Sequence, residues 1–525
     1  MVAHVEEAYA LLDEFEAHAS RPPTTLVFNW TITSGLRSPD GVEKQVYLVN
    51  DEFPGPLIEA RSGDRLVVQV DNGLVDQDIS LHWHGLSLKD QNAMDGAVGL
   101  TQVPVKPGST FVYNFTIGNN ESGTFWWHSH SDLQRADGLW GGLIVHSPEE
   151  DHALEEDYLI MVSDWFHRNQ TEVLTWYADA SSRGNEPVPD SLLINGQGRF
   201  NCSKAVPVRP ISCSQIELNG LKPLFKSVNK SIRLRVANTG SIAGFTIRLS
   251  GAKIQPAYVD GGFSVHSAAV RRSGILYPGQ RVDFSVEWDS TISDNHQLII
   301  SMDDEYVHVS DAIDRWTDEA SRNFGYSNPS LDPTQTFPAS YKDSGTSDTK
   351  EAQLDSDATE IQVLEPQTLK SATKVTEIPP KAEQTLVFYA KTEKLAHLNY
   401  EPVGFINHTS WKPQTQPLIS LNRSAWDENQ LVPSIGITSK KPKRVDIVIN
   451  NLDDGAHPFH MHGHSFYILS SYRNPGRDSW GSYNPFTGQP PPNGLNLDFP
   501  VRRDTEYGRS IVTCWFIWHE VWQWG

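Results

Sequence analysis

Short runs in which apolar and polar residues alternate recur along this 525-residue chain. Successive side chains of an extended strand point to opposite faces, so a period of two predicts half-buried β-strands. Clear examples are TTLVFNWTI, RLVVQVDNGL, STFVYNFTI, SIRLRVANTG, RVDFSVEW and KRVDIVINN. Glycine, proline and asparagine punctuate the segments between them, which is typical of turns. The pattern therefore predicts an all-β protein.

These runs form three groups, which predict three domains. The groups cover residues 24–148, 155–310 and 383–525. Residues 1–23 precede them as an acidic extension that reads as a short amphipathic helix. Residues 325–380 are polar, acidic and rich in proline, so we expect a linker or long loop there.

Histidines gather in three places that this pattern assigns to strands or strand ends. LHWHGL contains His82 and His84, WWHSHSD contains His128 and His130, and HPFHMHGH spans 457–464. Two histidines separated by one residue place both imidazoles on the same face of a strand. Each pair alone fits ordinary core or surface histidines, whereas three clusters together favour a metal site. Because the first and third domains supply them, a single site would lie between these domains.

The charge balance excludes one class of partner. Lysine and arginine number 43 against 65 aspartate and glutamate residues, which gives a net charge of −22. Nucleic acids select basic surfaces, so we expect no nucleic-acid partner. An acidic solvated surface is the simpler interpretation, although it would also attract cationic substrates. No apolar run is long enough for a transmembrane helix, and no feature indicates an oligomeric state.

Cysteines and glycosylation sequons bear on the cellular compartment. Cys202 and Cys213 are close enough along the chain to form a local disulfide, which leaves Cys514 unpaired. Asn-x-Ser/Thr sequons begin at Asn29, Asn114, Asn120, Asn169, Asn201, Asn229, Asn407 and Asn422. They predict a secreted glycoprotein, yet the N-terminus does not resemble a signal peptide. These two signals conflict, and one resolution is that the natural N-terminus is absent from this sequence.

The histidine motifs, together with MDGAVGLTQ and VDGG, resemble the multicopper oxidases, in particular the fungal laccase and iron-oxidase branch. The resemblance covers roughly residues 24–510. It implies three cupredoxin-like Greek-key β-sandwich domains. It also implies a type 1 copper that takes single electrons from a reducing substrate, and a type 2 and binuclear type 3 cluster that reduces O2 to water.

The resemblance also implies a role for individual residues. In chain order it assigns His82 to type 2 copper, His84, His128 and His130 to the type 3 pair, His457 to type 1 copper, His460 to type 2 and His462 to type 3. His464 is usually not a ligand. Asp95, in AMDG, matches a carboxylate that orients water and relays protons to O2. An aspartate before Gly96 equally fits a simple turn.

The chain departs from the family near its C-terminus, where the family carries a motif close to HCHIEWH. TCWFIWH keeps the spacing of Cys514 and His519, but Thr513 and Trp515 replace two type 3 histidines and Ile517 replaces the acidic residue. Either the site is divergent, or the third domain ends in an aberrant segment. We favour the second hypothesis, because the strand expected between RRDT and the cysteine is missing. We expect this chain to bind copper poorly and to reduce O2 slowly or not at all.

The reducing substrate is weakly specified. The resemblance favours a laccase-like oxidase of phenols, with a ferroxidase as the alternative. Glu186 aligns with an iron-binding carboxylate of fungal iron oxidases, and Asp303 and Asp304 add acidic groups that suit iron. A turn before a strand also explains the segment around Glu186. A third alternative is a copper-binding cupredoxin protein without catalytic activity.

Overall fold

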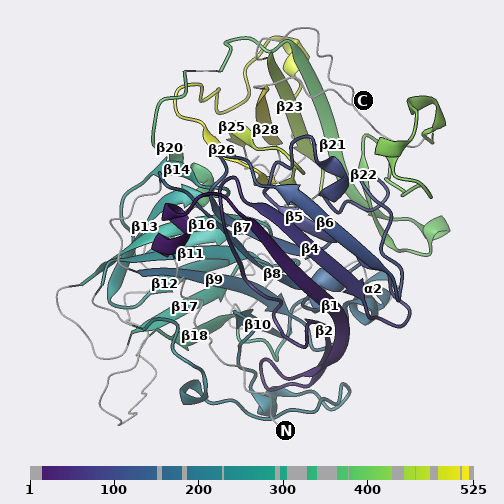
Figure 1. Cartoon of the computed structure of the whole chain (residues 1–525), viewed down its shortest axis with the longest axis vertical. Coiled ribbons are helices and arrows are strands. Elements are labelled where there is room, and N and C mark those ends of the chain that lie inside the picture. The colour runs from purple at the N-terminus through teal and green to yellow at the C-terminus, as the bar shows by residue number, and fades with distance from the viewer. Residues whose placement is uncertain are drawn as a thin grey trace, which may run out of the picture.

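The computed structural model consists mainly of β-strands (Figure 1). It describes residues 15–149, 156–179, 182, 186–226, 230–289, 296–303, 328–339, 363–376, 378–427, 443–453, 455, 457–472, 483–508 and 511–518. Two α-helices are present in this part of the chain, α1 (Phe15–Ser20) and α2 (Gln170–Ala178). Neither is long and apolar enough to cross a membrane. The all-β prediction is confirmed.

Two four-stranded sheets build the first domain. One has the order β2-β1-β4-β6, and the other has the order β3-β8-β7-β5. The strands are β1 (Thr25–Arg37), β2 (Lys44–Val49), β3 (Ile58–Arg61), β4 (Arg65–Asn72), β5 (Leu81–His84), β6 (Thr110–Thr116), β7 (Gly123–Ser129) and β8 (Trp140–His146). Trp30, Trp83 and Trp127 are buried together between the sheets. Their apolar area supplies much of the driving force that holds β5 and β7 in place.

The second domain is a larger sandwich of seven and five strands, ordered β10-β9-β11-β16-β13-β14-β20 and β18-β17-β12-β15-β19. Its strands are β9 (Glu156–Trp165), β10 (Ser191–Ile194), β11 (Ile232–Asn238), β12 (Phe245–Leu249), β13 (Ala252–Val259), β14 (Phe263–His266), β15 (Arg272–Leu276), β16 (Arg281–Trp288), β17 (Gln297–Met302), β18 (Thr334–Pro338), β19 (Val363–Leu364) and β20 (Lys370–Ser371). The prediction of a linker over 325–380 is wrong for β18, β19 and β20, which pair with strands of this domain. Cys202 and Cys213, whose pairing the sequence left open, form a disulfide.

The third domain, in green and yellow in Figure 1, has a six-stranded sheet ordered β22-β21-β23-β28-β25-β26 and a two-stranded sheet of β24 and β27. Its strands are β21 (Gln384–Lys394), β22 (Pro402–Ile406), β23 (Lys443–Asn451), β24 (His457–His460), β25 (Phe466–Tyr472), β26 (Val501–Arg503), β27 (Thr505–Gly508) and β28 (Ile511–Trp518). Single 3-10 turns connect the strands: η1 (Asn92–Met94), η2 (Gln134–Asp137), η4 (Cys202–Lys204), η5 (Leu218–Gly220), η8 (Pro366–Thr368), η9 (Ala396–Leu398), η10 (Leu418–Ser420), η11 (Arg423–Ala425) and η12 (Pro485–Thr487).

Strand β28 corrects the interpretation of the C-terminal segment. It pairs antiparallel with β23, as β6 pairs antiparallel with β4 in the first domain. The expected loss of the strand after RRDT is therefore wrong, because residues 511–518 form that strand. Cys514 lies opposite Ile447 and Ile468 on a counterpart of β6, not of the histidine-bearing β7. The alignment of Cys514 with the family cysteine loses its support, and His519 lies outside the described residues.

Arg281 joins the three domains at their common boundary. It begins β16 in the second domain and is fully buried. Its Nε donates to the carbonyl of Thr124 in the first domain at 3.0 Å. Its Nη1 and Nη2 donate to the two carboxylate oxygens of Asp504 in the third domain at 2.6 and 2.5 Å. This paired, doubly bonded geometry is the strongest form of an Arg–carboxylate contact.

We predict that Arg281→Leu lowers the free energy of unfolding by about 3–5 kcal/mol, because Asp504 would keep a buried charge without its partner. Urea denaturation followed by tryptophan fluorescence measures the loss. Arg271→Leu is the control, since its ion pair with Asp289 is much more exposed and should contribute at most about 1 kcal/mol. Equal effects of the two substitutions would contradict the prediction.

Candidate metal centre

Six of the seven predicted histidines meet between the first and third domains. His82 and His84 lie on β5 and His128 lies on β7, with His82 directly opposite His128 in the strand register. The third domain contributes His460 and His462, whose rings lie against those of the first domain. The ring centroids of His84 and His460 are 3.7 Å apart, and those of His82 and His462 are 3.9 Å apart. The sixth ring is that of His130, 4.9 Å from His462.

Backbone carbonyls fix the orientation of these rings. The Nδ1 atom of His82 donates to the carbonyl of Asp95 at 2.8 Å. Likewise His128 Nδ1 donates to the carbonyl of Ser129 at 2.9 Å, and His460 Nδ1 to that of Asp504 at 2.9 Å. Because a carbonyl oxygen only accepts, the proton of each neutral imidazole must sit on Nδ1. The Nε2 lone pair of each ring is therefore free to bind a metal.

The free nitrogen atoms converge. His82 Nε2 and His460 Nε2 are 3.3 Å apart, so two lone pairs face each other when both rings are neutral. Possible ligand atoms lie within 4.8 Å of one another in three groups: His82, His460 and His462; His82, His84 and His128; and His84, His460 and Asp504. A cation among these atoms would relieve the repulsion between the lone pairs. Sets of several imidazoles suit copper, zinc, iron or nickel.

Asp95 holds two of the rings. Its Oδ2 accepts from Nδ1 of His462 at 2.8 Å, and its Oδ1 lies 3.2 Å from Nδ1 of His82. Burial alone would raise the pKa of this carboxyl, but His82 and His462 outweigh it and hold the pKa well below the usual range. Gly96 allows the approach, since it has a φ of +86° and a Cβ there would meet the carbonyl of Leu81. The turn brings the carboxylate to the histidines, so the two interpretations of Asp95 are compatible.

Asp504 is a group at this site to which the sequence analysis gave no role. Its carboxylate is buried and lies 3.5 Å from Nε2 of His84 and 3.6 Å from Nδ1 of His460. Burial would raise its pKa, but Arg281 and the two histidines hold the pKa well below the usual range. The residue belongs to the RRDT segment, more than forty residues after His460. A motif search centred on histidine spacing has no reason to select it.

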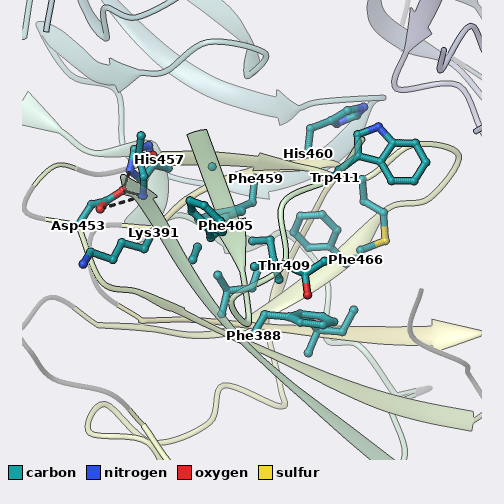
Figure 2. Close-up of a pocket in the computed structure, with 17 residues that line it drawn as sticks. Phe388, Lys391, Phe405, Thr409, Trp411, Asp453, His457, Phe459, His460 and Phe466 are labelled. Atoms are coloured by element: carbon teal, nitrogen blue, oxygen red, sulfur yellow. Dashed lines mark hydrogen bonds and ion pairs between the residues drawn. The ribbon is translucent and has the colours of Figure 1, made fainter. Parts of the chain in front are cut away.

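His457 stands apart from the cluster. Its Nε2 lies 2.6 Å from Oδ2 of Asp453, at the rim of a cavity of about 510 Å³ that Figure 2 shows. Aromatic rings line this cavity, among them Phe388, Phe405 and Phe459. His464 donates its Nδ1 proton to the carbonyl of His462 at 3.1 Å. Neither residue belongs to the three groups of possible metal ligands in the described part of the chain.

The acidic residues considered for iron lie in different places. Glu186 is exposed and lines a second cavity of about 660 Å³ that also reaches His84, His128 and His457. Asp303 is buried and accepts from the hydroxyl of Tyr277 at 3.2 Å, away from this cavity. Asp304 lies outside the described residues. Asp453, which the sequence analysis did not consider, lies beside His457 instead.

Burial keeps two of the clustered histidines neutral. It lowers the pKa of both His84 and His128 well below 6.5, and neighbouring histidines lower it further. In the unfolded chain these imidazoles take up protons below about pH 6.5, whereas the folded protein leaves them neutral. The folded state therefore loses stability as the pH falls through this range.

We predict that the free energy of unfolding of the metal-free protein falls by about 1.4 kcal/mol per pH unit for each of these two histidines below about pH 6.5. Urea titrations at about pH 7.5 and about pH 5.5 measure this dependence. In the variant His128→Asn, the free energy of unfolding should change less steeply with pH, by the contribution of one histidine. A slope that the substitution leaves unchanged would show that His128 titrates normally in the folded protein.

Family models described as multicopper oxidase match residues 31–150, 156–313 and 408–507. Laccase-1 of Cryptococcus neoformans var. grubii is 32% identical over 518 residues, which are 95% of this chain and 76% of the relative. The iron transport multicopper oxidase fetC of Epichloe festucae is 31% identical, over 92% of this chain and 70% of the relative.

Solved structures agree in fold. The structure of Fet3p, described as a multicopper oxidase that functions in iron import, matches this chain with a TM-score of 0.76 and 24% sequence identity. The match covers 94% of this chain and 86% of the Fet3p chain. The laccase from Botrytis aclada matches with a TM-score of 0.72 and 22% sequence identity, and the match covers 95% of this chain and 84% of the laccase chain. The three matched segments and the similarity to the Cryptococcus laccase lead to one conclusion: the chain belongs to the multicopper oxidase family.

Proposed function

We propose that this protein is a laccase-like oxidase, which couples one-electron oxidation of phenols to the four-electron reduction of O2 to water. The observation that carries the proposal is the convergence of imidazole Nε2 atoms between the first and third domains. Similarity to laccases over almost the whole chain supports the assignment. The substrate class rests on the cavity beside His457.

The donor set fits copper. The ion would be held by imidazoles of both domains: His82, His84, His128, His460 and His462. Where Nδ1 of a ring already makes a hydrogen bond to an oxygen atom, Nε2 is the atom that would bind the metal. Bound copper would supply the capacity to accept electrons one at a time and to pass them to O2. Asp95 keeps His462 in position, and because its pKa is held well below the usual range it remains ionised and offsets positive charge beside the cluster.

The cavity beside His457 suits an aromatic substrate. Phe388, Phe405 and Phe459 give it apolar walls against which a planar ring can stack (Figure 2). Asp453 and His457 lie together at one side, where a carboxylate can accept the proton of a phenolic hydroxyl. A few polar groups at the rim of an apolar pocket are the usual composition of a small-molecule site.

Ferrous iron is the second candidate substrate. Burial raises the pKa of Tyr177 to about 12, and the charges of Glu186 and Asp453 raise it in the same direction. The two carboxylates therefore lie near one phenol ring, and carboxylate oxygens suit iron better than they suit an organic ring. The similarity to fetC supports this alternative as well.

A copper-binding protein without oxidase activity is the third candidate. The observation in its favour is the register of β28, which places Cys514 opposite Ile447 rather than on a counterpart of β7. Of the three cysteines, Cys202 and Cys213 are bonded to each other. A copper site without a cysteine thiolate would lack the strong blue colour of a type 1 centre.

Copper content and oxygen consumption separate these candidates. We predict that His82→Ala reduces copper bound per chain and slows oxygen uptake with a phenol at least about tenfold, because His82 belongs to two of the three ligand groups. His296→Ala is the control, since that histidine lies in the second domain and donates to the carbonyl of Ser250. Oxygen uptake that is unchanged in His82→Ala would contradict the proposal. Copper binding without oxygen uptake in the unsubstituted protein would favour the non-catalytic alternative.

The iron alternative has its own test. If ferrous iron binds at Glu186, we predict that Glu186→Gln raises the KM for iron roughly fivefold, since an exposed ion pair is worth at most about 1 kcal/mol. The KM for 2,6-dimethoxyphenol should stay the same, because that ring would bind in the other cavity. Initial rates of oxygen uptake with each substrate give both constants. Equal changes for the two substrates would contradict a separate iron site.

A further inference from the structure

An arginine without a polar partner lines the cavity of about 660 Å³ that reaches the histidine cluster. Arg135 belongs to the turn η2, which follows the histidine strand β7, and its side chain is half-buried. The guanidinium lies 5.9 Å from the centre of the Trp126 ring, but it makes no hydrogen bond or ion pair with any residue that the structure describes. Because arginine keeps its charge, a cation with five N–H donors is available at this wall.

The carboxylate whose charge acts on Arg135 is already occupied. Asp164 accepts from the backbone nitrogen of Ser241 at 2.9 Å, and from those of Ile242 and Ala243 at 2.7 Å each. Burial lowers the pKa of the Arg135 guanidinium, and the charge of Asp164 offsets only part of this effect. The cost of burying the guanidinium is therefore not balanced within the chain, and an anion in the cavity would reduce it.

Two further polar side chains of this cavity lack partners in the described part of the chain. Gln170 begins α2 and is 6% exposed, yet its Nε2 donates no hydrogen bond. The hydroxyl of Ser241, in the loop after β11, is also buried without a partner. Native proteins rarely leave such groups unpaired unless a ligand or water completes them. A guanidinium, an amide N–H and a hydroxyl together form a donor set that suits a carboxylate.

Apolar side chains form another part of the wall. Leu133 and Leu174 line the cavity and are 37% and 38% exposed, which is unusual for large apolar residues of a soluble protein. A small inorganic anion would use the polar donors and leave both leucines in water. A carboxylate that carries an apolar body would use the donors and cover the leucines as well, which is the usual composition of a small-molecule site.

The other charged and titratable groups of the cavity do not favour a cation at Arg135. Asp132 and Glu186 also line the cavity, but both are exposed, so water screens their charges. His84 and His128 are kept neutral, chiefly by burial, and Arg135 lowers the pKa of His128 further. The unscreened charge at the half-buried wall is therefore that of the guanidinium, and it attracts an anion.

We propose that this cavity binds an organic monocarboxylate with an apolar body, such as an aromatic acid, through Arg135, Gln170 and Ser241. The carboxylate would accept from the guanidinium in a paired geometry, and the apolar body would lie against Leu133 and Leu174. The acid would lie beside the histidine cluster without serving as a metal ligand. The proposal does not depend on the oxidase function, because the site needs no metal.

Isothermal titration calorimetry of the full chain, dialysed against a chelator, tests the site with benzoate as the probe. We expect one benzoate bound per chain. Benzamide has the same shape without the charge and should bind at least about tenfold more weakly, because charged hydrogen bonds are the stronger ones. Absence of benzoate binding, equal binding of benzamide, or binding that appears only when copper is added overturns the proposal, whether or not the protein oxidises any substrate.

Substitutions locate the carboxylate. Arg135→Leu should weaken benzoate binding at least about tenfold, and Arg135→Lys should recover part of the loss, because it restores the charge without the forked geometry. The matched control is Arg168→Leu, since that arginine is also half-buried beside a tryptophan but lines a different cavity. Its affinity for benzoate should equal that of the unsubstituted protein. Unchanged binding in Arg135→Leu, or an equal loss in the control, overturns the assignment.

Acetate tests the apolar part of the proposal. It offers the same carboxylate without the ring, so it should bind several-fold more weakly than benzoate. The double variant Leu133→Ser, Leu174→Ser should weaken benzoate binding several-fold and leave acetate binding unchanged. If acetate binds as tightly as benzoate, the cavity is a general anion site, and the choice of an acid with an apolar body is overturned.

Discussion

The site depends on a buried arginine that touches three domains at once. Arg281 bonds to the backbone of Thr124 beside the first histidine strands and to the carboxylate of Asp504 beside the second set. The backbone carbonyl of Asp504 then holds His460 through its Nδ1. The position of the third-domain histidines relative to the first domain is therefore set by a hydrogen-bonded chain, not by apolar packing alone. Such chains define one geometry because a displaced partner would leave a charge unpaired.

The electrostatics of the cluster serve metal binding. Burial and mutual repulsion keep His84 and His128 neutral, and neutrality is what a ligand nitrogen needs. Two ionised carboxylates, Asp95 beside His82 and His462 and Asp504 beside His84 and His460, compensate part of the positive charge that a metal would bring. The same arrangement leaves the metal-free protein with facing lone pairs at His82 and His460. The geometry favours the loaded state.

The sequence alone predicted those features of the protein that are encoded in short stretches of consecutive residues. The alternation of apolar and polar residues predicted strands, and the spacing of the histidines identified six side chains that meet at the site. Both signals are contained in a few consecutive residues. Asp504 and Asp453 were missed because their roles come from the way distant strands pack. The sequence also left the role of Cys514 open, and we favoured an aberrant segment over a divergent copper site. Spacing matched a motif, but the pairing of β28 with β23 is a long-range property that no short window contains.

The division of the cluster between the first and third domains has a consequence for assembly. Neither half holds enough imidazoles to form the three-ligand groups that include His460, so a metal bound to them acts as a clamp between domains. Ligand that binds only the docked arrangement stabilises that arrangement by mass action. Metal availability during folding would then control how often the third domain settles against the first, and the ion would work as a late assembly factor as well as a reactive centre.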